Sequence, residues 1–273
     1  MSLPFQNPDG SAPSIAQVMA RARLIEDIGF DGIWFGETIG RTATARPDPL
    51  VWLSMAAAGT QRVELGTAIL QTPLRYPVEF AQRLMTLHAL SGGRFRAGLG
   101  AGSTKADFDA VGVDFDGRFR EFSQGLKTIR ALLNGEQVGE ANLQPWPNAV
   151  GGPPIYLGAW ESGLWVKRAA RDYDGWLASG RTTFKALREG IKRFRDAGGK
   201  RALVATVSID LSKPEAALNQ DENFSLACGP KSAKERLHLL EEMGYDDVLL
   251  VRMNHTEADI TEADLRSYRA LTS

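Results

Sequence analysis

The sequence predicts an α/β fold, the closed (β/α)8 TIM barrel of parallel strands and surrounding helices, in a single domain over residues 1–273. Apolar runs of strand length alternate with segments of helical period along the chain, which is typical of a parallel sheet. The length of 273 residues favours a closed barrel over a doubly wound sheet, because such barrels run to about 250 residues. No shift in composition and no linker rich in proline and serine divides the chain.

The first helix and strand set the pattern. Apolar residues recur at helical spacing over 15–28, behind Ser14, a residue that can cap the first turn. Gly29 follows the last turn, where a helix often ends on a glycine. The apolar run 32–36 comes next and has the length of a buried strand.

The same alternation continues to the C-terminus. Strands are expected at 32–36, 63–70, 94–100, 154–159, 175–179, 202–209 and 247–251. Helices are expected at 15–28, 49–58, 78–90, 120–133, 163–170, 184–197, 231–243 and 264–271. Residues 135–153, rich in glycine and proline, are expected to form a long loop.

One strand of the barrel is short of residues. Seven strands are predicted after Ser14, so the eighth must precede it, and only Leu3, Pro4 and Phe5 are available there. The sequence therefore predicts a truncated first strand and a weaker barrel at that seam.

Charge and composition exclude several classes of protein. Lysine and arginine number 32 against 33 acidic residues, so the net charge of −1 gives no reason to expect nucleic acid or an anionic membrane as partner. No apolar run approaches the roughly 20 residues of a membrane span. The single cysteine, Cys228, excludes internal disulfides and favours the cytoplasm. The three histidines are far apart, so no metal motif is present and no metal is expected.

Candidate functional residues are those that follow the strands, since the carboxyl ends of barrel strands form the reactive face. Glu37 follows the strand 32–36 and could be a general base or a hydrogen-bond acceptor. The glycine-rich segment 98–104 fits neither the phosphate loop nor the dinucleotide fingerprint, so phosphate binding and simple packing both stay open. Residues 160–163 open a helix whose N–H groups could hold an anion.

The histidines differ in their expected positions. His255 falls just past the last strand, where ligand contact and a solvated loop both stay open. His88 and His238 lie within predicted helices and are expected to be packed or surface residues.

Taken in order, these motifs resemble the bacterial luciferase-like monooxygenase family. The resemblance begins with Gly29 to Trp34 followed by Glu37 and runs from about residue 14 to 251. Its other matching stretches are 48–49, 56–60, 63–67, 86–94, 98–102, 153–156, 168–170, 174–176 and 229–230. Each motif alone is weak, but their order along most of the chain is specific.

The resemblance implies a luciferase-like barrel that binds FMN or coenzyme F420 and catalyses oxygenation or hydride transfer on a small organic substrate. It implies that Glu37 and Thr38 lie beside the ring of the cofactor, and that a non-prolyl cis peptide lies near the third strand. The remaining cofactor-binding residues implied by position are Thr67, Ala68 and Ile69 at the ring, Gly100, Ser103 and Thr104 toward the ribityl phosphate, and Gly158, Ala159, Glu161, Ser162 and Gly163 at the phosphate. A homodimer is also implied.

Two departures from the family pattern bear on activity. Many members carry histidine where this chain has Thr38, a hydroxyl that cannot act as a base at neutral pH. His255 is the candidate to replace it, and a Glu37→Ala variant is expected to lose turnover more than fold. The chain is also short, with little room for lid-like insertions, and its compactness leans toward F420. The alternatives are a non-catalytic or degenerate flavin-binding barrel, and an unrelated phosphate-handling barrel enzyme.

Overall fold

The computed structural model describes residues 1, 6–39, 45–161, 163–252 and 260–272. The chain forms two compact units. We call the first, residues 14–23 and 31–155, the N-terminal unit. The second, residues 1–13, 24–30 and 156–273, is the C-terminal unit. Helix α1 (Ile15–Ile28) contributes residues to both. The expectation of one domain over residues 1–273 stays a prediction.

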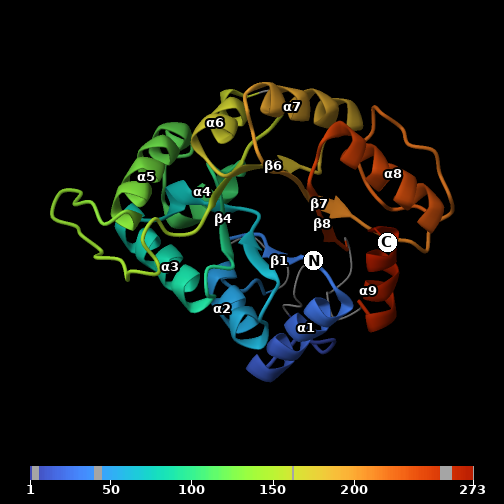
Figure 1. Cartoon of the computed structure of the whole chain (residues 1–273), viewed down its shortest axis with the longest axis horizontal. Coiled ribbons are helices and arrows are strands. Elements are labelled where there is room, and N and C mark those ends of the chain that lie inside the picture. The colour runs from blue at the N-terminus through green and yellow to red at the C-terminus, as the bar shows by residue number, and fades with distance from the viewer. Residues whose placement is uncertain (2–5, 40–44, 162, 253–259, 273) are drawn as a thin grey trace. The chain divides into compact units, whose positions relative to one another are not determined.

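The N-terminal unit is a parallel sheet covered by helices. Its strands are β1 (Gly32–Phe35), β2 (Glu64–Thr67), β3 (Leu70–Gln71) and β4 (Phe95–Gly100), with β1 beside β2 and both β2 and β3 beside β4. Its helices are α2 (Pro49–Gly59), η1 (Thr72–Leu74), α3 (Pro77–Leu90), α4 (Lys105–Val111) and α5 (Arg118–Leu133). Figure 1 shows α3 and α5 side by side along the outer side of these strands.

The C-terminal unit repeats this arrangement. Parallel strands β5 (Ile155–Gly158), β6 (Gly175–Ser179), β7 (Ala202–Ser208) and β8 (Asp247–Val251) pair in that order. The helices are α6 (Leu164–Asp172), α7 (Phe184–Asp196), α8 (Pro230–Met243), α9 (Glu262–Arg269) and η3 (Ala270–Thr272). In the view of Figure 1, α6, α7 and α8 follow one another along the outside of these strands.

Most predicted elements are confirmed, and two details differ. The bounds predicted for β6 and β8 are those observed. The strand expected at 63–70 is instead divided into β2 and β3 by a cis peptide bond between Ala68 and Ile69. Helix α4 was not predicted, because seven residues are too few for a clear helical period. The short first strand at Leu3 to Phe5 lies outside the described residues.

A long connection joins β7 to α8 at the carboxyl end of β7. We call residues 209–229 the β7–α8 segment. At its base the Leu226 amide donates to the Ser208 carbonyl at 2.7 Å. The buried Arg236 of α8 donates to the Ser225 carbonyl at 2.7 Å and to the Ala216 carbonyl at 3.1 Å. This segment is therefore an ordered excursion at the carboxyl end of β7.

The opposite ends of strands β2 and β4 are tied together by one arginine. Arg94 donates to the Val63 carbonyl at 3.1 Å, to the Thr60 hydroxyl at 2.9 Å and to the Ala57 carbonyl at 3.0 Å. Polar contacts at the amino ends of barrel strands contribute to stability rather than to chemistry.

None of the helices in the described part of the chain is long and apolar enough to cross a membrane.

Candidate active site

The first group of predicted site residues lies at the carboxyl ends of β1, β2 and β4, all within the N-terminal unit. Thr67 is fully buried, and its hydroxyl donates to the Gly98 carbonyl at 3.0 Å and accepts from the Gly98 amide at 2.9 Å. The Thr67 hydroxyl thus acts as donor and as acceptor, in both cases toward the backbone of β4. The side chain of Thr67 therefore joins β2 to β4.

Ala68 and Ile69 directly follow Thr67, between β2 and β3; we call these two residues the Ala68–Ile69 edge. The bond between these residues is cis, as the family resemblance implies, and both residues are partly exposed. The Ala68 amide donates to the Phe35 carbonyl at 3.0 Å, and the Glu37 amide donates to the Ile69 carbonyl at 3.3 Å. The end of β1 therefore holds this edge by backbone contacts.

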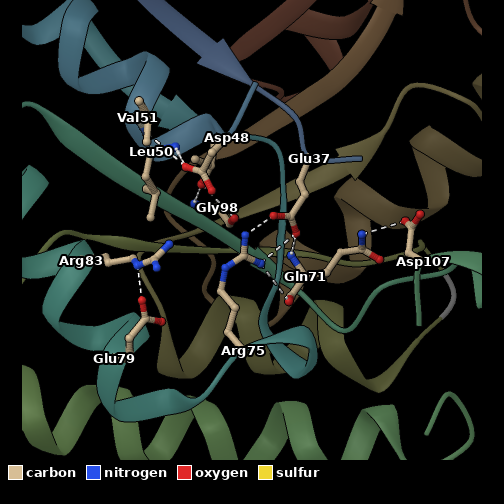
Figure 2. A network of polar contacts seen from close by, with 11 residues as sticks. Glu37, Asp48, Leu50, Val51, Gln71, Arg75, Glu79, Arg83, Gly98 and Asp107 are labelled. Carbon is tan, nitrogen blue, oxygen red and sulfur yellow. Dashed lines mark hydrogen bonds and ion pairs between the residues drawn. The ribbon is translucent and has the colours of Figure 1, made fainter. Parts of the chain in front are cut away.

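Glu37 is buried and fully engaged. Its side chain is 2% exposed, and one carboxylate oxygen, Oε2, accepts from the Gln71 amide at 2.9 Å and from Arg75 Nη1 at 3.0 Å. The other oxygen, Oε1, forms an ion pair with Arg75 Nη2 (Figure 2). Two guanidinium N–H groups on one carboxylate give a strong, directional contact. The arrangement makes Glu37 an anchor between strand ends.

Gln71 and Asp107 extend this contact to helix α4. Gln71 Nε2 donates to Asp107 Oδ2 at 2.8 Å, and both residues are buried (Figure 2). Gly102 approaches closely: a β-carbon there would lie 2.7 Å from Gln71 Oε1, and φ is +81°. Gly102 thus fits both the left-handed backbone and the narrow space.

Arg75 and Asp107 are absent from the residues predicted as the site. Arg75 stands beyond η1, four residues past the end of β3, and Asp107 lies within the unpredicted helix α4. Gln71 immediately follows the predicted strand 63–70, and this strand-end position is the one feature of the sequence that marks it as a site residue. Ion pairing between positions 37 and 75 cannot be read from spacing alone.

The hydroxyl residues near the ends of β1 and β4 are accessible. Thr38 is partly exposed, and Ser103 is exposed. Gly100, the predicted glycine between them, is the last residue of β4 and is buried. Thr104 is the residue before helix α4, and its carbonyl accepts from the Asp107 amide at 3.1 Å. These positions are compatible with contact to a polar ligand.

The second group of predicted residues lies in the C-terminal unit, between β5 and α6. Gly158 and Ala159 are partly exposed, and the Ala159 carbonyl accepts from Trp176 Nε1 at 3.0 Å. Gly163 precedes helix α6, and none of the described side chains caps that helix. A helix N-terminus without a side-chain cap presents backbone N–H groups and a positive dipole end to an anion.

The side chain of Glu161 packs against helix α7 at Gly190. Its side chain is buried, and Oε1 has no hydrogen-bond partner among the described residues. Burial raises the pKa of this carboxyl, and a hydrogen bond from Thr182 offsets part of the effect. The Glu161 carbonyl accepts from Arg193 Nη1 at 2.9 Å.

The remaining candidates fall elsewhere. Ser162 and His255 lie outside the described residues. His88 is half-buried at the end of α3, and burial together with the Arg96 charge lowers its pKa. His238 is exposed, with Nδ1 3.5 Å from a Glu241 oxygen and Nε2 3.3 Å from a Glu242 oxygen. The expectation that these two histidines are packed or surface residues is confirmed.

Parallel strands in series with helices, and polar groups at the strand ends, define the class as a barrel-type α/β protein. The chain matches the family model described as luciferase-like monooxygenase over residues 1–219, and it belongs to that family. The F420-dependent glucose-6-phosphate dehydrogenase of Kineococcus radiotolerans is 33% identical over 222 residues, covering 72% of this chain and 64% of that protein. The chain spans 38% to 64% of the length of the first curated relatives that it matches.

Solved structures show the same fold. The monooxygenase RslO1 from Streptomyces bottropensis superposes with a TM-score of 0.78 at 17% identity, covering 99% of this chain and 96% of that one. The oxygenating constituent of 3,6-diketocamphane monooxygenase from Pseudomonas putida, solved with FMN, superposes with a TM-score of 0.75 at 13% identity, covering 97% and 93%. The predicted luciferase-like TIM-barrel class is confirmed.

Proposed function

We propose that this chain is an oxidoreductase that binds FMN or coenzyme F420 at its strand ends and acts on a small organic substrate. The observation that carries the proposal is the N-terminus of α6, where no side chain of the described residues caps the helix and where the neighbouring Glu161 side chain is buried. A phosphate group there would meet backbone donors and no opposing carboxylate. The names of family relatives support both cofactors.

The described residues fit such a cofactor in two separate places. In the C-terminal unit, backbone groups of Gly158, Ala159 and Gly163 would hold the phosphate. In the N-terminal unit, the partly exposed Ala68–Ile69 edge would border the ring.

The cofactor would supply the redox chemistry, oxygen activation by reduced FMN or hydride transfer by F420. The residues of this chain would bind and orient it. Glu37 and Arg75 would fix the edge of the ring site, and Thr38 would offer a hydroxyl for hydrogen bonding. A threonine hydroxyl cannot exchange protons as a base at neutral pH, so His255 is our candidate for proton transfer.

A direct test compares ligands that differ only in the phosphate. We expect FMN to bind more tightly than riboflavin, measured by quenching of flavin fluorescence, because only FMN carries the phosphate. F420 and reduced FMN are titrated in parallel by calorimetry. Tight binding of F420 alone favours a dehydrogenase or reductase, and preference for reduced FMN favours a monooxygenase. Equal affinity for FMN and riboflavin would contradict the phosphate site.

One observation favours a second function, a flavin-binding barrel without catalysis. The Glu37 carboxylate is occupied by Arg75 and the Gln71 amide, and Thr38 replaces the family histidine. Binding of FMN without oxygen consumption and without substrate turnover would support it.

We further propose a cytoplasmic homodimer. The cytoplasmic location rests on the single cysteine, Cys228. Helix α2 contains no charged residue, yet Val51 is 58% exposed on it. A helix that is apolar all round is normally covered by protein. Light scattering after size-exclusion chromatography gives the mass, and a Val51→Glu variant is expected to shift it to that of a monomer.

A further inference from the structure

The pair of Glu37 and Arg75 is built as a buried, two-point contact. The Glu37 side chain is 2% exposed and that of Arg75 is 11% exposed. The Arg75 guanidinium lies over the Phe80 ring, 5.1 Å from its centroid, so its free rotation is limited by packing as well as by charge. Removing one member of a buried pair leaves the other charge uncompensated.

The same pair closes around the Ala68–Ile69 edge. Glu37 donates its own amide to the Ile69 carbonyl and accepts the Gln71 amide on its carboxylate, so it holds both residues that flank Leu70. Arg75 Nη1 also lies 3.4 Å from the Gln71 carbonyl. The Glu37 carboxylate therefore holds the backbone amide of Gln71, and the Arg75 guanidinium holds its backbone carbonyl.

From these contacts we propose that Arg75 is a positioning residue, which holds the Glu37 carboxylate as an anchor of the Ala68–Ile69 edge rather than as a proton acceptor. This inference rests on the proposed binding of a flavin at that edge. It assigns a role to Arg75, a residue that the strand-end pattern does not include. Of the two roles that the sequence left open for Glu37, general base and hydrogen-bond acceptor, it selects the acceptor.

The contact continues to the neighbouring strand end through Gln71. The Gln71 side chain donates to buried Asp107, so a displacement of residue 71 would also disturb helix α4. The predicted residues Ser103 and Thr104 immediately precede this helix. Arg75 therefore acts on two parts of the proposed cofactor site through one backbone segment.

The test uses three variants and one matched control. Arg75→Met removes the charge, Arg75→Lys keeps the charge but loses the two-point contact, and Glu37→Gln combined with Arg75→Met removes both charges together. The control is Arg96→Met. Arg96 pairs with Glu64 at 2.9 Å in the same unit, at the opposite ends of β2 and β4. Melting temperature and circular dichroism report the folded fraction of each.

The readouts are the dissociation constants of FMN and riboflavin and the visible absorption band of bound FMN. We expect Arg75→Met to weaken both ligands about tenfold, since an unpaired buried carboxylate displaces its surroundings. Riboflavin should be affected as strongly as FMN, because the edge concerns the ring. Arg75→Lys should recover part of the affinity, and the double variant should lie within about threefold of wild type. Arg96→Met should lower only the melting temperature.

Several results would overturn the inference. These are a folded Arg75→Met variant with wild-type affinity and absorption, an equal loss in Arg96→Met, or an affinity loss for FMN alone. If Arg75→Met does not fold, Arg75→Lys and the double variant decide: failure of both to approach wild-type affinity when folded rejects the role. If wild type binds neither FMN nor F420, the proposed function itself fails, which the wild-type titration shows separately.

Discussion

Glu161 and Gly190 pack so closely that a β-carbon at position 190 would lie 2.9 Å from Glu161 Cβ and 3.0 Å from its Cγ. The same β-carbon would lie 2.7 Å from Trp176 Cη2, and Trp176 is fully buried. The glycine in helix α7 therefore provides the space that the buried Glu161 side chain occupies.

Gly190→Ala is expected to lower the free energy of unfolding by about 2 kcal/mol, because overpacking a core displaces buried side chains. This outweighs the stabilisation of about 1 kcal/mol that alanine normally gives over glycine within a helix. The control is Gly125→Ala in helix α5, where the nearest atom, Thr72 Cγ2, lies 3.2 Å from the added carbon. Urea unfolding measures both. Equal stability of the two variants would contradict the packing argument.

Glu161→Gln tests the buried carboxyl through its pH dependence. Because burial raises the pKa of Glu161 in the folded state, the folded protein holds this proton more tightly than the unfolded chain. Its contribution to stability is complete below the unfolded pKa and is lost as the pH rises through the folded pKa.

The melting temperature of Glu161→Gln relative to wild type should therefore increase as the pH is raised from 4 upward, with the difference levelling off above the folded pKa. Burial and the Glu161 charge raise the pKa of neighbouring Tyr245, so the phenol stays neutral over this range. Arg193 Nη1 donates to the Glu161 backbone carbonyl at 2.9 Å. A constant difference between pH 4 and 9 would contradict the prediction.

Glu37→Ala is expected to lose fold as well as activity, unlike the expectation from sequence. Arg75 would remain in its packed position without the carboxylate, a loss of about 3 kcal/mol for a broken buried pair. Glu37→Gln, which can still accept hydrogen bonds, should lose less. Urea unfolding ranks the variants, and an unchanged midpoint in Glu37→Ala would show that the pair adds nothing to stability.

Thr67→Val is expected to destabilise the protein by about 2 kcal/mol, since the Gly98 amide and carbonyl would lose their buried partner. Thr67→Ser keeps the hydroxyl and serves as the control. Thermal unfolding by circular dichroism distinguishes the two. If Thr67 instead binds the cofactor directly through its hydroxyl, Thr67→Val would weaken FMN while leaving the melting temperature unchanged.

The sequence was sufficient to predict elements whose apolar runs are continuous and end at clear turns. Strand β6 ends before Gly180, and β8 lies between the charged residues Asp246 and Arg252. The division into β2 and β3 was not predictable from the sequence, because neither glycine nor proline stands at the break, and Ala68, Ile69 and Leu70 continue the strand-like run.

The candidate site was predictable in position but only partly in role. Glu37 was identified because it follows a strand, whereas its partner Arg75 is distant in sequence and only the fold brings them together. For Glu161, the sequence placed its backbone beside a helix end but could not give the direction of its side chain. That direction depends on Gly190 and Trp176, which belong to a different helix and strand.

The clamped base of the β7–α8 segment has a consequence for how this protein can change. Ser208, Leu226 and Arg236 fix the base of the segment, and the buried Phe224 stacks on Phe184 of α7. Changes in length are therefore best tolerated at the exposed residues 219–222. Loop closure adds only about 0.6 kcal/mol for each doubling of length. The segment is thus a natural place for grafting, where a chimera with a relative's loop would acquire new selectivity while keeping the parent scaffold.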